Sequence, residues 1–156
     1  GAKFVIEDVF GGVLFGPDGE DLFFAKAALF KPRVTAVEKN GIIGAEYIQN
    51  LRVRAAGLGL PYIIQEVQTM NDMVFRMSEI APYFRAQQIM VSDAVSSGLD
   101  VFRTEWARFP RGHDDTLSAV HLAWQVSKHL VTAPGAAYRP RRAQANPWNS
   151  LAGMKV

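Results

Sequence analysis

The sequence predicts an α/β fold in which helices pack against a sheet. Two observations lead to this prediction. Short runs of β-branched and aromatic residues alternate along the chain with longer runs whose apolar residues recur at helical spacing. Gly, Pro and Asn clusters separate the runs, as expected of turns. With 156 residues, about half of them hydrophobic, the chain fits one domain with a sizeable core.

Four short runs predict the strands. Residues 3–10 (KFVIEDVF) alternate in polarity, and a Gly-Gly pair follows them. Residues 34–38 (VTAVE) are mostly apolar on both faces, which is typical of a strand covered by helices. The remaining two predicted strands are residues 61–67 (PYIIQEV) and 88–91 (QIMV).

Five runs predict helices. They cover residues 20–31, 44–58, 71 to about 84, 100–108 and 114–131. Asp18 is the expected N-cap of the first helix, and Pro32 ends it. The positions expected to be buried in the first three are Leu22, Ala25 and Leu29, then Ile48, Leu51, Ala55 and Leu58, then Met70, Val74, Met77, Ile80 and Phe84.

The last predicted helix is apolar over most of its circumference. A narrow polar stripe runs along it, consisting of Asp114, Ser118, His121, Gln125 and His129. Such a helix is expected to be buried against the sheet, so its N-terminus is the natural place for a functional site. We expect the domain to span residues 1–132. Residues 133–156, which carry three arginines and three prolines, are expected to form an extended or disordered basic tail that docks on a partner.

Composition excludes several classes of protein. The chain has no cysteine, which excludes a disulfide framework, a thiolate metal site and a cysteine nucleophile. No apolar run is long enough to span a membrane, and the N-terminus lacks a signal-peptide pattern, so we expect no membrane contact and no secretion. The net charge of +2 permits a polyanionic partner without requiring one.

Acidic residues stand at two positions where a carboxylate needs an explanation. Glu38 ends a buried strand, where its charge is costly unless a cation meets it, and that cation is either Lys39, an arginine or a metal ion. Asp114 and Asp115 begin the last helix, whose dipole stabilises each of them by roughly 0.3–1 kcal/mol. His113 beside them either orients an acid or a water molecule, or simply lies in the loop.

Catalysis is the alternative to these structural roles. Mg²⁺ and Mn²⁺ prefer oxygen ligands, and two such ions about 3.5–4 Å apart stabilise both the attacking and the leaving oxygen of a phosphodiester. If Glu38 and the Asp114–Asp115 pair meet at the sheet edge, they form a candidate site of this kind.

The motifs that surround these acids resemble those of the C-terminal nuclease domain of phage large terminase subunits. The resemblance runs from Phe4 to about Gln125 and is most specific in FPRGHDDTLSA, then in VTAVEKNGIIG. It implies a ribonuclease-H-like fold with a mixed central sheet flanked by helices. It also implies a two-metal (Mg²⁺ or Mn²⁺) endonuclease that cuts concatemeric double-stranded DNA. Glu38 is then the second metal-binding acid, and Asp114 or Asp115 supplies the last.

The chain departs from the family pattern at two points. Ser118 stands where the family commonly has a third Asp. The family's first catalytic Asp lies on a strand before the one that residues 3–10 resemble, so we expect this chain to lack that first strand. Glu7 or Asp8 either replaces the missing acid or belongs to an exposed strand edge. No phosphate-binding loop of an ATPase motor occurs in the sequence.

The resemblance also implies partners. Lys39, Arg76, Arg108 and Arg111 are candidates to contact DNA phosphates, although each is individually compatible with an ordinary surface charge. In the full protein the expected partners are an ATPase motor domain, the portal and the small terminase subunit, in the cytoplasm of the infected host. Two alternatives stay open: a catalytically incomplete module that holds DNA or docks on the portal, and another ribonuclease-H-like enzyme such as a junction resolvase.

Overall fold

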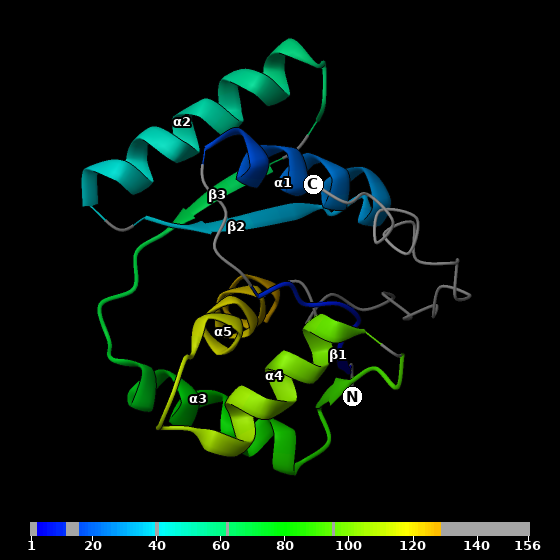
Figure 1. Ribbon diagram of the computed structural model, residues 1–156, viewed down its shortest axis with the longest axis vertical. Coiled ribbons are helices and arrows are strands. Elements are labelled where there is room, and N and C mark those ends of the chain that lie inside the picture. Colours follow the sequence, from blue (N-terminus) through cyan, green and yellow to red (C-terminus); the bar gives the residue numbers. More distant parts are fainter. Residues whose placement is uncertain (1–2, 12–15, 40, 62, 95, 129–156) are drawn as a thin grey trace, which may run out of the picture.

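The α/β alternation predicted from the sequence is confirmed in the computed structural model, which describes residues 3–11, 16–39, 41–61, 63–94 and 96–128 (Figure 1). The strands are β1 (Phe4–Ile6), β2 (Val34–Glu38), β3 (Ile63–Val67) and β4 (Ile89–Val91). The helices are α1 (Pro17–Phe30), α2 (Gly41–Gly57), α3 (Met73–Arg85), α4 (Ser97–Arg108) and α5 (Asp115–Ser127).

The described strands form two separate pairs, whereas one mixed sheet was expected. β1 pairs with β4 and β2 pairs with β3, both in parallel, with Phe4 opposite Ile89 and Val34 opposite Ile63. Each parallel pair therefore needs a helical crossover, which α2 supplies for β2–β3. α5 packs on α3 and α4 and also lies against β2, so it connects the two sheets (Figure 1).

Each sheet has its own apolar core. The first core lies between β2–β3 and the helices α1 and α2, and consists of Phe24, Ile48, Leu51, Ala55 and Ile64. The second lies among β1, β4, α3, α4 and α5, and consists of Ile6, Met77, Ile80, Ile89, Leu99, Phe102, Leu117, Val120 and Trp124. Figure 1 shows β2–β3 with α1 and α2 on one side and α5 on the other.

The predicted helix faces are confirmed in part. Ile48, Leu51 and Ala55 are buried as predicted, but Leu58 lies beyond the end of α2 and is 57% exposed. Met77 and Ile80 are also buried. Met70 precedes α3 and is 88% exposed, because α3 begins only after Asp72, whose side chain accepts a hydrogen bond from the Phe75 amide at 2.8 Å.

Further corrections concern α1 and α3. Val74, predicted to be buried, is exposed, and the buried face of α3 includes Arg76 instead. Phe24 and Ala27 form the buried face of α1, while the predicted Ala25 is exposed. Gly16 is the N-cap of α1, with φ 50°, so Asp18 is wrong as the cap and lies inside the helix.

The C-terminal segment that the sequence analysis expected to be a basic tail, residues 133–156, lies outside the described residues. Within the described ranges, no helix has both the length and the apolar character needed to cross a membrane.

Candidate functional site

Glu38 lies at the end of β2, opposite Val67 of β3, and its side chain is 22% exposed. The Lys39 amide donates to the Val67 carbonyl at 2.8 Å, which continues the strand pairing past this point. The Thr69 hydroxyl, just beyond β3, donates a hydrogen bond to Glu38 Oε1. The carboxylate thus has one neutral donor on its own sheet and needs a cation from elsewhere.

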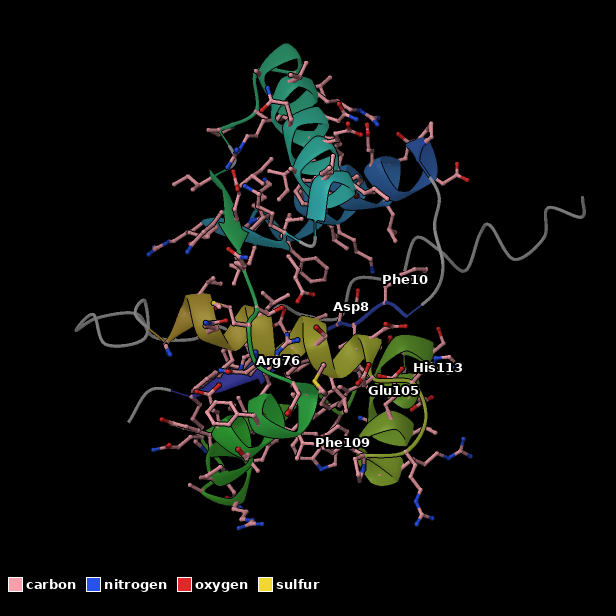
Figure 2. All side chains as sticks on the ribbon, turned by 90° about the vertical axis from the view of Figure 1, so that its left-hand side faces the viewer. Asp8, Phe10, Arg76, Glu105, Phe109 and His113 are labelled. Atoms are coloured by element: carbon pink, nitrogen blue, oxygen red, sulfur yellow. The ribbon has the colours of Figure 1, made fainter. Side chains whose placement is uncertain are left out.

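Arg76 of α3 supplies that cation. Its Nη1 lies 3.7 Å from Glu38 Oε1, so the ion pair with an arginine, one of the alternatives from the sequence, is present. The other two nitrogens bind α5: Nε donates to His121 Nδ1 at 3.1 Å, and Nη2 donates to Ser118 Oγ at 2.9 Å. Figure 2 shows Arg76 beside α5, between the two sheets. Since Arg76 is only 6% exposed, this guanidinium is held inside the protein by three elements.

His121 carries the network on to α3. Its Nε2 lies 3.1 Å from Glu79 Oε2. Because Nδ1 accepts the proton of Arg76 Nε, a neutral His121 must carry its own proton on Nε2 and donate it to Glu79. Burial lowers the pKa of His121, with Arg76 and Lys128 acting in the same direction and the Glu79 carboxylate opposing them. The neutral form is therefore favoured in the folded chain.

The lowered pKa of His121 predicts a pH-dependent stability. Below the ordinary histidine pKa of about 6.5 the unfolded chain binds the proton more readily than the folded chain, so the free energy of unfolding should fall as pH falls. His121→Gln keeps an acceptor for Arg76 but does not titrate, so this fall should shrink between pH 7 and pH 5. Urea unfolding at several pH values measures both curves.

His113 provides the matched control for this prediction, because it is an exposed histidine just before the helix that carries His121. His113→Gln should leave the pH dependence of the native chain in place. A His121→Gln chain that loses stability toward pH 5 as steeply as the native chain would contradict the assignment.

Asp114 and Asp115 stand at the start of α5, where the sequence put them. Asp114 is the N-cap residue but makes no capping hydrogen bond, and Asp115 is exposed in the first turn. The cap comes from Glu105 of α4 instead, whose Oε2 accepts hydrogen bonds from the Thr116 amide, at 2.9 Å, and from the Thr116 hydroxyl. No pattern in the sequence predicts this role for Glu105.

Glu38 ends β2 and the Asp114–Asp115 pair begins α5, and within the described residues these acids do not form one group that could hold a metal ion. Ser118, which contacts Arg76, is one helical turn, about 5.4 Å of rise, beyond Asp114. Figure 2 shows His113 and Glu105 toward one end of α5 and Arg76 farther along it. His113 is exposed in the loop before α5, as its loop interpretation predicts.

Glu7 and Asp8 follow β1, whereas the sequence analysis expected them inside that strand. Asp8 pairs with Lys26 of α1 and accepts a hydrogen bond from Ser96 Oγ at 3.3 Å. Both acids line a cavity of about 430 Å³ between the β1 segment, α1 and α5. Most of its other lining residues are apolar, including Phe4, Phe10, Phe30 and Ala119.

The candidate DNA-binding residues fall into two groups. Arg108 ends α4 and Arg111 follows it, and both are exposed. Lys39 is exposed but pairs with Glu66 of β3 at 3.0 Å. Arg76 differs from these three because it is buried, so it does not face a DNA backbone in this arrangement.

Oxygen donors of the kind that Mg²⁺ and Mn²⁺ prefer are present at Glu38 and at the Asp114–Asp115 pair. Within the described residues, no three His, Cys, Asp or Glu side chains are grouped so that they could hold one metal ion. The Glu38 oxygen that faces α5 already meets the positive charge of Arg76. The described arrangement is therefore one in which an arginine, rather than a metal, neutralises Glu38.

Comparisons with protein-family models, with curated proteins and with solved structures found no match to this chain.

Sequence reasoning missed the contribution of Ser118, His121 and Thr69 to the Glu38 environment. The signal for the first two was the polar stripe of α5, which recurs every three or four residues in an otherwise apolar helix. Ser118 and His121 of this stripe face Arg76 rather than water, and His121 is only 3% exposed. Gln125, in the same stripe, has a buried Oε1 without a hydrogen-bond partner in the described part of the chain.

Proposed function

We propose that this chain is part of the nuclease domain of a viral DNA-packaging terminase. Its activity is the hydrolysis of phosphodiester bonds in concatemeric double-stranded DNA, and it requires Mg²⁺ or Mn²⁺. The ribonuclease-H-like fold, the motor, portal and small-subunit partners and the host cytoplasm belong to the same proposal. Its basis in the sequence is the pair of motifs VTAVEKNGIIG and FPRGHDDTLSA.

One observation carries the proposal. The end of β2, with Glu38, lies against the helix that FPRGHDD begins, since Arg76 contacts both Glu38 and Ser118. The two motifs are separated by about 70 residues in the sequence, yet they are neighbours through one side chain. A nuclease of this type needs such proximity, because its metal-binding acids come from a strand and a helix.

The state of the helix acids also supports the proposal. Neither Asp114 nor Asp115 forms an ion pair within the described residues. The capping hydrogen bond that Asp114 does not accept is accepted by Glu105. Two adjacent carboxylates repel each other unless a cation is bound. Their position is not explained by a capping hydrogen bond, and a bound cation would stabilise the pair in addition to the helix dipole.

The proposal is tested by cleavage of supercoiled plasmid with Mn²⁺. Glu38→Ala and Asp115→Ala should each lower the cleavage rate at least about 100-fold, since each removes a proposed metal ligand. Asp114→Ala tests which acid of the pair is needed. Glu66→Ala is the matched control, because Glu66 lies on the neighbouring strand and pairs with exposed Lys39 and Arg52. Unchanged cleavage by Glu38→Ala would contradict the proposal.

The Arg76–Glu38 contact favours a second function, a module that holds DNA or docks on the portal without cutting. In such a module Arg76 alone neutralises the Glu38 carboxylate, and no metal ion is needed there. DNA binding should then be indifferent both to Mn²⁺ and to Glu38→Ala, and no plasmid should be cut. Gel-shift and cleavage assays with the same variants therefore separate the two functions.

A further inference from the structure

We propose that Arg76 is the resident cation of Glu38 and closes this carboxylate to divalent metal as long as the guanidinium stays in place. The inference rests on the proposed function, because it concerns metal access to the same site. Glu38 is the acid expected to bind metal, yet the guanidinium of Arg76 faces its Oε1.

Arg76 is held in place by α5 and does not merely lie near Glu38. Ser118 Oγ, the Ser118 carbonyl and His121 Nδ1 accept from the guanidinium at 2.9, 3.4 and 3.1 Å. The planar fork of arginine is then fixed in direction by α5, and its remaining nitrogen, Nη1, points to Glu38. If Arg76 were at the surface, cations from solution could replace it at Glu38, but Arg76 is only 6% exposed.

The positive charge of Arg76 competes with a divalent ion for Glu38. A divalent ion at Glu38 would have to stand within a few ångströms of the guanidinium, and like charges at that distance repel strongly where water is largely excluded. Metal and Arg76 are therefore mutually exclusive at Glu38 Oε1. The guanidinium must therefore leave Glu38 before a divalent ion can bind there.

Ser118 binds Arg76 without adding a negative charge. A serine accepts the guanidinium as a neutral partner, so the positive charge of Arg76 remains available to Glu38. An aspartate at residue 118 would compete with Glu38 for the same charge. In the sequence, Ser118 was a departure from the expected metal site. In the structure, it is the residue that holds the guanidinium of Arg76 in place.

The test is Mn²⁺ binding without DNA, measured by water-proton relaxation. Arg76→Gln should bind Mn²⁺ at least about tenfold more tightly than the native chain, since the competing charge is gone. Adding Glu38→Gln to Arg76→Gln should abolish the gain, because the gain requires the Glu38 carboxylate. Arg52→Gln, which frees exposed Glu66 of one guanidinium, is the matched control and should show no gain.

Two results would overturn the inference: equal Mn²⁺ affinity of Arg76→Gln and the native chain, or a gain in Arg76→Gln that persists when Glu38→Gln is added. If Arg76→Gln does not fold, Ser118→Ala replaces it, and its loosened guanidinium should still give a gain that depends on Glu38. Plasmid cleavage that depends on Glu38, without any gain in Arg76→Gln, would leave the proposed function standing and remove this inference alone. A Glu38-dependent gain without any cleavage would support the inference and count against the nuclease.

Discussion

Gly98→Ala should lower the free energy of unfolding by about 3 kcal/mol or more, because no space exists for the added methyl group. Gly98 is buried in the first turn of α4, and an ideal Cβ there would lie 1.5 Å from the carbonyl oxygen of Val9. The obstacle is backbone, which cannot rotate away, so α4 and the segment after β1 must separate. Thermal unfolding should show a melting temperature lower by roughly 10 °C.

Gly57→Ala is the matched control for this substitution. Gly57 ends α2, and a Cβ at that position would meet no heavy atom within 4 Å. Alanine favours helix over glycine, so this variant should unfold at the native temperature or slightly above it. Equal melting temperatures of the two variants would show that α4 does not approach Val9 as closely as described.

Glu105→Leu should be the second large effect, with a loss of about 3 kcal/mol in the free energy of unfolding. Glu105 is 8% exposed, and its carboxylate accepts from both the amide and the hydroxyl of Thr116. Thr116 is fully buried, so the leucine variant leaves two donors without a partner at the start of α5. Urea unfolding measures the loss.

Two variants separate the capping role from a general effect of charge. Glu105→Gln retains an acceptor oxygen and should lose about 1 kcal/mol. Asp114→Ala should change stability by less than about 0.5 kcal/mol, because Asp114 makes no capping bond, whereas an N-cap that does so is worth about 1 kcal/mol or more. A larger loss in Asp114→Ala than in Glu105→Leu would reverse the assignment of the cap.

Local features of this chain were readable from the sequence. The alternation of helices and strands, the buried positions Ile48, Leu51 and Ala55 of α2, and the start of α5 after His113 all follow from periodicity and turn residues. These depend on neighbours within a few positions, which a periodic pattern reports directly. Met70 was wrong because it precedes the N-cap at Asp72, where helical periodicity no longer applies, and Val74 was wrong because it lies on the exposed side of the first turn of α3.

The partners of the polar residues were decided by the tertiary structure alone. The sequence determined that Glu38 needs a cation, because burying an unpaired charge is costly. It also determined that α5 carries a polar stripe, because the spacing of its polar residues shows one. It did not determine that Arg76 is that cation, or that Glu105 rather than Asp114 caps α5. Those choices depend on which side chains of α3, α4 and α5 meet once the two cores have packed, and contacts such as Glu38 with Arg76 join residues far apart in the chain.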